Sequence, residues 1–181
     1  MIENPYIVTF TGKKVHPLNA TPDELCIEDI AHALAYKCRW SGHTTRFHSI
    51  AQHSVIVANL FTLQPLWGLL HDASEAYLAD VPSLIKPHLP TLKYAEDQLM
   101  EVIQKKFKLP NLDRHEEMVL KRADWASMKH EWETMVYNPE GHDIGIDLRD
   151  VPEIHVPAAK TSWMPVEAER VFLKVYRELV K

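Results

Sequence analysis

Residues 69–86, with the sequence LLHDASEAYLADVPSLIK, place one imidazole and three carboxyl groups within ten residues of a largely apolar stretch. The four are His71, Asp72, Glu75 and Asp80. Burying such groups without partners costs several kcal/mol, so we expect this stretch to hold a charge. Pro65, at the first position of a helix, predicts one helix over 65–79, and in that helix His71 and Glu75 point to the same side.

Most of the remaining chain is also predicted to be helical. Thr21, Pro22 and Glu24 have the spacing of a capping box, which opens a helix that runs to Cys38 or Trp40. Apolar residues recur at helical spacing in four further stretches. These are residues 49–61, 92–107, 112–136 and 166–180.

Two segments lack that spacing. Residues 6–17 alternate β-branched and aromatic side chains and predict a short β-hairpin. Residues 138–165 combine several prolines with two glycines and predict a long irregular connection. We therefore expect a single all-α domain over 1–181, a bundle of about six helices with its core at about 21–137 and a C-terminal helix at 166–180.

The composition excludes several classes of function. With 46% hydrophobic and 25% charged residues over 181 positions, the chain is long enough for one sizeable core. A formal net charge of -5 gives no basic field for a nucleic-acid polymer, and no apolar run approaches the roughly 20 residues of a membrane helix. The first residues also lack the pattern of a signal peptide. We expect neither a nucleic-acid nor a membrane partner.

Cys26 and Cys38 are the two cysteines of the chain, and both fall in the helix predicted to begin at Thr21. Helical rise then puts them roughly 18 Å apart, which is too far for a disulfide. We expect free, buried thiols, which suit a reducing compartment and hence a cytoplasmic protein.

Two further candidate metal ligands lie in flanking helices, His53 in IAQHSVIVA and Asp124 in LKRADWASM. Three helices can thus converge on one cation, with His71 and Asp72 leaning toward it from the edge of the middle helix. Imidazole nitrogens together with carboxylate oxygens suit Mn, Fe, Co, Zn or Mg. A structural polar network is the competing interpretation of these residues.

The order of these candidate ligands, H…HD…D, resembles the metal signature of the HD-domain phosphohydrolases. The segments HDASEAYLADVPSLIKP and AQHSV are similar to the 5′-deoxynucleotidase-like branch of that family, which includes phage dATP phosphohydrolases. The resemblance covers roughly residues 25–135 and reaches into the last helix. It implies that the helical bundle is an HD domain.

The resemblance also implies a metal centre. It assigns His53, His71, Asp72 and Asp124 to one tightly held divalent ion, which is Co, Mn, Zn or Mg. Such an ion lowers the pKa of bound water and neutralises charge on phosphorus, which are the two needs of phosphoester hydrolysis.

Further positions match the catalytic and substrate-binding residues of the family. Glu75 matches the carboxylate that handles the attacking water or the proton of the leaving group, and Asp80 matches a second acid near the sugar. Arg39 and Trp40 match a pair that meets the substrate, the arginine at phosphate oxygens and the tryptophan against the deoxyribose. The remaining predicted substrate contacts are Arg46 and Lys86.

Each of these assignments has a purely structural alternative. Glu75 can be a surface residue of a helix, and Asp80 can start the turn that precedes Pro82. Arg39 can be a charge favoured at a helix C-terminus, and Trp40 can be an ordinary core aromatic.

The resemblance implies a metal-dependent hydrolase of nucleotide metabolism that cleaves the 5′-phosphate ester of deoxynucleotides. The substrate is either a dNMP, which yields deoxynucleoside and phosphate, or a dNTP such as dATP, which yields deoxynucleoside and tripolyphosphate. The alternatives are a catalytically silent nucleotide-binding or regulatory module, and another HD phosphodiesterase acting on cyclic nucleotides or alarmones. From the resemblance alone we expect a homo-oligomer in the bacterial cytosol or in the cytosol of a phage-infected host.

Overall fold

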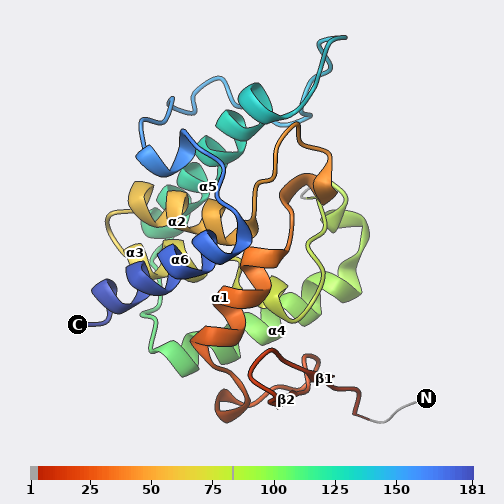
Figure 1. Cartoon of the computed structure of the whole chain (residues 1–181), viewed down its shortest axis with the longest axis vertical. Coiled ribbons are helices and arrows are strands. Elements are labelled where there is room, and N and C mark those ends of the chain that lie inside the picture. The colour runs from red at the N-terminus through yellow and green to blue at the C-terminus, as the bar shows by residue number, and fades with distance from the viewer. Residues whose placement is uncertain (1–3, 83) are drawn as a thin grey trace.

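The computed structural model describes residues 4–82 and 84–181 and confirms the all-α bundle with a short N-terminal β-hairpin (Figure 1). The α-helices in these ranges are α1 (Ile27–Tyr36), α2 (Ile50–Leu60), α3 (Pro65–Leu70), α4 (Pro90–Phe107), α5 (Arg114–Met135) and α6 (Pro165–Leu179). Strands β1 (Ile7–Val8) and β2 (Lys14–Val15) pair antiparallel. Of the predicted domain, residues 1–3 and 83 lie outside the described part.

Helix α2 forms the centre of the bundle and contacts α1, α3, α5 and α6. Its residues 50–58 are all buried. Gly68 allows α3 to approach α2 closely, because a Cβ at that position would lie 2.8 Å from the Cα of Ala58. This close packing brings the C-terminal end of α3 next to His53, which lies in the middle of α2.

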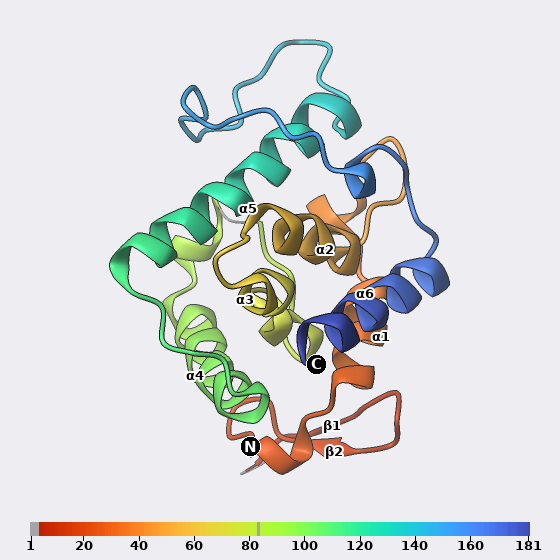
Figure 2. The same ribbon diagram turned by 90° about the vertical axis from the view of Figure 1, so that its left-hand side faces the viewer.

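The hairpin and the long connection lie at opposite ends of the molecule in both views (Figures 1 and 2). The carboxylate of Asp29 ties the hairpin to α1, since it accepts hydrogen bonds from Thr11 N and Thr9 Oγ1, each at 2.8 Å. The connection is irregular, as predicted, apart from a short 3-10 helix at Pro157–Ala159. No helix in the described ranges combines the length and the apolar character needed to cross a membrane.

The side chain of Gln52 anchors the connection to the centre of the bundle. Its Nε2 donates to the carbonyl of Ala158 (2.7 Å), and its Oε1 accepts from the backbone N–H of Trp163 (3.0 Å). Because Gln52 is completely buried and precedes His53, these bonds fix the end of the connection to the part of α2 that carries His53.

The helix predicted to start at Thr21 is shorter than expected at both ends. The Thr21 N–H donates to Glu24 Oε2 (3.1 Å), but this turn is a 3-10 helix, and Leu25 is extended before α1 begins. Leu25 is completely buried, and its packing outweighs the local helical signal. At the other end Lys37 is extended, because its carbonyl accepts a hydrogen bond from Ile50 N (3.1 Å).

As a result, Cys26 and Cys38 lie outside α1 and do not share one helix. Both are free thiols, as predicted, but they are half-buried and not buried. Cys26 Sγ donates to Asp29 Oδ2 (2.9 Å) at the start of α1. The separation calculated from helical rise therefore does not apply.

The helix predicted over 65–79 is also wrong in extent, because α3 ends at Leu70. Asp72 leaves the helical conformation (φ −103°, ψ 16°), and a 3-10 helix follows at Ala73–Ala76. The expectation that His71 and Glu75 share one face of an α-helix is therefore wrong.

Lys37 stabilises the non-helical path of the chain after this break. Its Nζ reaches from the end of α1 and donates to the carbonyls of Glu75 and Leu78, the latter at 2.7 Å. These carbonyls lie in the segment that was predicted to continue the helix. A partner distant in the sequence thus satisfies the Glu75 carbonyl, which the predicted helix would have bonded to the N–H of residue 79, and the Leu78 carbonyl, for which Pro82 has no N–H to donate.

Candidate metal centre

Three elements bring the predicted ligands together. His53 comes from α2, whose start is capped by Ser49 Oγ accepting from Gln52 N (3.1 Å). His71 lies at the C-terminal end of α3, and Asp124 comes from α5. His53 Nε2 lies 3.3 Å from His71 Nε2 and 3.3 Å from Asp124 Oδ1, and all three ligand atoms lie within 4.8 Å of one another.

Asp72 completes the predicted set at the same point. Its Oδ2 lies 3.2 Å from His71 Nε2 and 3.7 Å from His53 Nε2. The four side chains meet although His71 and Asp72 do not belong to a continuous helix, because the turn after α3 directs both toward α5.

The other ring nitrogens of the two histidines are already engaged. His53 Nδ1 lies 2.7 Å from Glu131 Oε1 and 3.1 Å from Ser127 Oγ, and His71 Nδ1 lies 2.8 Å from the carbonyl of Gly68. A ring that donates from Nδ1 to a carboxylate or carbonyl presents the lone pair of Nε2 to a cation. The two imidazole nitrogens and the Asp124 carboxylate can therefore hold a divalent metal ion, and the Asp72 carboxylate lies beside the two histidines.

The electrostatics of the four groups also favour positive charge at this point. Burial and the charge of Arg39 lower the pKa of His53, but the carboxylates of Glu131 and Asp124 outweigh them and raise it to about 9. Burial raises the pKa of Asp72 and Asp124, but the charges of the two histidines outweigh it and hold both pKa values well below the ordinary range.

Glu131 is the central residue of the network beneath the metal centre, and our sequence analysis missed it. It is completely buried on α5 and accepts from Trp40 Nε1 (2.9 Å) and Arg39 Nε (3.1 Å) through Oε2, while Oε1 faces His53. Burial raises its pKa, but the charges of Arg39 and His53 hold it well below the ordinary value. Its position seven residues after Asp124, on the same helix face, is the sequence signal that could have identified it.

The predicted pair Arg39 and Trp40 occupies a tight turn at the edge of the centre. Trp40 and Ser41 have positive φ values of 56° and 51°, which for non-glycine residues cost about 1–2 kcal/mol each. The hydrogen bonds to Glu131 hold this turn in place, and Arg39 Nη1 lies 3.6 Å from Asp72 Oδ2.

Glu75 and Asp80 lie on the other side of Asp72, in a pocket of about 180 Å³ that Arg39 and Trp40 also line. Burial, together with the charges of Asp72 and Asp80, raises the pKa of Glu75 to about 8, although the ammonium of Lys86 opposes the shift. Burial is also the main reason that the pKa of Asp80 is raised.

The predicted basic contacts differ in position. Lys86 lines the small pocket and pairs with Glu75 Oε1 (2.7 Å) and Glu96 Oε1 (3.1 Å). Arg46 is exposed and is not a lining residue of the pockets next to the centre. Lys121 was not predicted from the sequence, and its Nζ lies 3.2 Å from Asp124 Oδ2. Its position one helical turn before Asp124 is the sequence signal that could have identified it.

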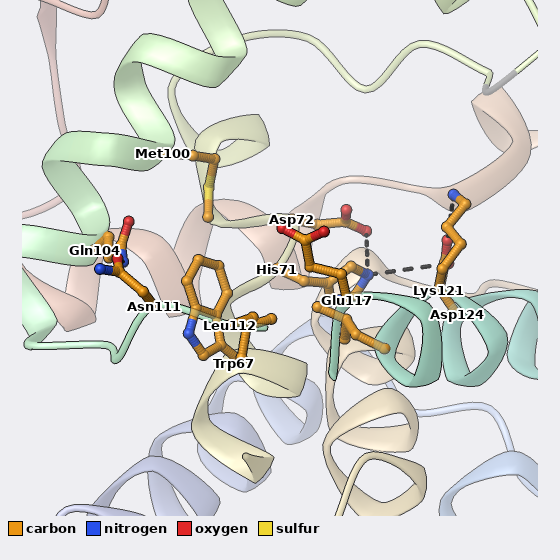
Figure 3. A pocket seen from close by; sticks show the side chains of 11 residues that line it. Trp67, His71, Asp72, Met100, Gln104, Asn111, Leu112, Glu117, Lys121 and Asp124 are labelled. Carbon is orange, nitrogen blue, oxygen red and sulfur yellow. Dashed lines mark hydrogen bonds and ion pairs between the residues drawn. The ribbon is translucent and has the colours of Figure 1, made fainter. Parts of the chain in front are cut away.

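A second and larger pocket, of about 620 Å³, is lined by His71, Asp72 and Asp124 of the centre (Figure 3). It lies between α3, α4 and the start of α5. Asp72, Lys121 and Asp124 line both pockets, so the small and the large pocket adjoin at the candidate metal centre.

These features define the chain as an all-α protein with a buried His–Asp centre that can hold a metal ion. No protein-family model matches it. It is 39% identical over 106 residues to the uncharacterized protein YfdR of Escherichia coli strain K12, a match that spans 58% of this chain and 60% of YfdR. It is 35% identical over 136 residues to the uncharacterized protein RCAP_rcc00048 of Rhodobacter capsulatus, spanning 68% of this chain and 69% of that protein. The chain belongs to the family of this Rhodobacter protein.

Proposed function

We propose that this protein is an HD-domain phosphohydrolase that uses a divalent metal ion to cleave the 5′-phosphate ester of deoxynucleotides. The observation that carries the proposal is the convergence of His53, His71, Asp72 and Asp124 on one point that both neighbouring pockets reach. The motif resemblance adds the family and the substrate class.

The proposed ion is one tightly held Co, Mn, Zn or Mg, which supplies an acidic bound water and neutralises charge on phosphorus. The four ligands hold it, and Glu131 and the Gly68 carbonyl keep the two histidine rings in the orientation that binding requires.

Glu75 is the proposed proton-transfer group. A carboxyl group with a pKa of about 8 is partly protonated and partly ionised near neutral pH, so it can either accept a proton from water or donate one to the leaving oxygen. Asp80 lines the same small pocket and is the proposed contact to the sugar. A binding module without turnover would not need a carboxylate beside the metal, so the presence of Glu75 supports the enzyme over that alternative.

Arg39 and Trp40 are the proposed substrate contacts at the mouth of the small pocket. Arg39 lies close enough to Asp72 for its guanidinium to reach an oxygen of a phosphate held there. Trp40, fixed by Glu131, offers an indole face against which a deoxyribose packs and a 2′-hydroxyl is crowded. Lys86 and Lys121 are further cations around the phosphate position, and Arg46 is a proposed outer contact.

From the resemblance we further propose a cytoplasmic homo-oligomer.

The test is a product assay on metal-stripped protein. Mn, Co, Mg and Zn are each added back, and a panel of dNMPs, dNTPs and the matching ribonucleotides is offered as substrate. Orthophosphate from dNMPs identifies a 5′-deoxynucleotidase, and tripolyphosphate from dATP or another dNTP identifies a triphosphohydrolase. Turnover of cyclic nucleotides or alarmones alone indicates a different HD chemistry, and no turnover with any metal rejects the enzyme in favour of a binding module.

A further inference from the structure

The large pocket next to the metal centre has the form of a slot with two unlike ends (Figure 3). Asp72 and Asp124 lie at one end, and the amide side chains of Gln104 and Asn111 lie at the other. Its volume of about 620 Å³ falls in the range of pockets that bind small organic ligands, roughly 300–1,000 Å³. The proposed function uses the first end of this slot but gives no role to the rest.

The middle of the slot is apolar and contains one aromatic wall. Trp67 of α3 and Met100 of α4 lie there together with Leu112 (Figure 3). Trp67 Nε1 donates to the carbonyl of Pro110 (2.7 Å), so the polar edge of the indole is satisfied and the ring is held in place. A flat apolar group can pack against such a fixed ring.

The far end carries a donor and an acceptor side by side. Gln104 Nε2 donates to Asn111 Oδ1 (2.7 Å), which leaves Gln104 Oε1 as an acceptor and Asn111 Nδ2 as a donor. Neither of these two atoms has a hydrogen-bond partner within residues 4–82 and 84–181. An adjacent donor and acceptor match the amide or amidine edge of a heteroaromatic ring.

The charges of the slot select against an anionic occupant. Lys121 is the basic residue among the described lining residues, and it already pairs with Asp124, whereas Glu117 adds a further carboxylate near the centre. A chain of additional phosphates would therefore lack neutralising partners in this slot. An uncharged ring meets no such cost.

The two pockets meet at the metal centre, because they share Asp72, Lys121 and Asp124. A phosphorus atom held there directs one substituent into the small pocket, toward Arg39 and Trp40, and a second substituent into the slot. A phosphate monoester fills the first position and leaves the second empty, whereas a diester fills both.

We propose that the slot binds an uncharged heteroaromatic group that is joined to the same phosphate through a second ester bond, so that the protein also hydrolyses phosphodiesters of a deoxynucleotide. This inference rests on the proposed phosphohydrolase function. Water adds its oxygen to phosphorus, and the bond between phosphorus and the oxygen of the group in the slot breaks with its electron pair going to that oxygen. One proton of the water ends on the leaving oxygen, and the other stays with the nucleoside monophosphate.

The experiment compares a dinucleoside monophosphate with the corresponding dNMP as substrates of the metal-loaded protein. Met100→Trp fills the middle of the slot, and Gln104→Leu removes the amide end with little change of volume. Met118→Trp is the matched control, since Met118 is exposed on α5 and is not a lining residue of the slot. We expect Met100→Trp and Gln104→Leu to lower the ratio of diester to monoester kcat/KM at least tenfold, and Met118→Trp to leave the ratio unchanged.

A binding measurement separates this inference from the proposed function. The same dinucleoside monophosphate is titrated into metal-free protein, and binding is measured by calorimetry and by the change in tryptophan fluorescence. The variant Trp67→Phe identifies the part of that fluorescence change that comes from Trp67. Binding that is weakened at least tenfold by Gln104→Leu supports the slot even if no substrate turns over, in which case only the proposed enzyme fails. Turnover of the dNMP without turnover or binding of the diester rejects the slot and leaves the proposed function intact. An unchanged ratio in both slot variants also rejects it.

Discussion

Glu131 Oε1 lies 2.7 Å from Nδ1 of His53, and Oε2 of the same carboxylate accepts the indole N–H of Trp40 at 2.9 Å. One buried side chain thus sets both the ring orientation of a candidate metal ligand and the position of a candidate substrate contact. The two sides of the site are therefore mechanically coupled, although His53 and Trp40 lie on different elements.

Glu131→Gln should weaken metal binding. The variant keeps the shape of the side chain but removes the charge that supports His53, and loss of such an outer carboxylate lowers metal affinity about 10–100-fold. Calorimetric titration with Mn or Co measures the change. Glu133→Gln, at an exposed position of the same helix, is the control and should bind metal like the unmodified protein. Equal affinities in the two variants would contradict the role assigned to Glu131.

Asp72→Ala and Glu75→Gln should separate metal binding from proton transfer. Asp72→Ala removes a proposed ligand, so metal and activity should be lost together. Glu75→Gln should retain the metal while kcat falls about 10²–10⁴-fold, the usual contribution of a general acid or base. Metal content and turnover are measured on the same preparations, and a fully active Glu75→Gln protein would rule out the proposed role.

Lys37→Met should lower turnover without removing the metal. Lys37 Nζ holds the carbonyls of Glu75 and Leu78, so its loss lets the segment that carries Glu75 shift. A misplacement of this kind costs about 10–100-fold in kcat, and two unsatisfied carbonyls destabilise the fold by about 1–3 kcal/mol each. Steady-state kinetics and chemical denaturation measure the two effects. Lys93→Met, at an exposed position, is the control. A drop in kcat of the same size in this control would contradict the role assigned to Lys37.

Trp40→Ala should relax the choice between deoxyribose and ribose. The ring is proposed to crowd a 2′-hydroxyl, so the ratio of kcat/KM for a deoxynucleotide over the matching ribonucleotide should fall about tenfold or more. Trp40→Phe retains a flat ring and should preserve most of the discrimination. An unchanged ratio in Trp40→Ala would show that this side chain packs in the core and has no part in discriminating deoxyribose from ribose.

Asp29→Asn should destabilise the protein in a pH-dependent way. Burial raises the pKa of Asp29, but hydrogen bonds from Cys26 and Thr11 outweigh it and lower the pKa below its ordinary value of 3.8. A lowered pKa in the folded state means that the ionised carboxylate contributes stability above the pKa of the unfolded chain, and that this contribution is lost as the pH falls through the folded pKa.

The free energy of unfolding of the unmodified protein should therefore exceed that of Asp29→Asn by about 1–3 kcal/mol at neutral pH, because an amide offers one acceptor oxygen where the carboxylate offers two to Thr9, Thr11 and Cys26. Denaturation curves of both proteins should converge at acid pH, below 3.8. A difference that is independent of pH would show that the charge of Asp29 has no part in holding the hairpin.

Local sequence signals determined most helix positions, because each signal acts within one turn of the chain. Ser49 caps α2, Pro65 and Pro90 occupy the first turns of α3 and α4, and the 166–180 periodicity matches α6. The ligand set could likewise be proposed from residue types and motif order, since His53, His71, Asp72 and Asp124 do meet in space. The ability of these residues to bind a metal ion depends more on the type of side chain than on the local backbone conformation.

The tertiary structure alone decided where the helices end and what surrounds the ligands. α1 ends where the Lys37 carbonyl accepts from Ile50 N at the start of α2, and Lys37 Nζ stabilises the non-helical segment after α3 through the carbonyls of Glu75 and Leu78. Local sequence patterns could not predict the Glu131 network or the two pockets, since the network depends on the packing of α2 against α5 and the larger pocket on the placement of α3, α4 and α5 around it. The sequence by itself determined the local propensities and the chemical groups of this protein. Contacts between residues far apart in the chain decided where α1 and α3 end, how the charged side chains around Glu131 are buried, and how the two pockets meet at the metal centre. Long-range hydrogen bonds and burial outweigh the smaller local preferences.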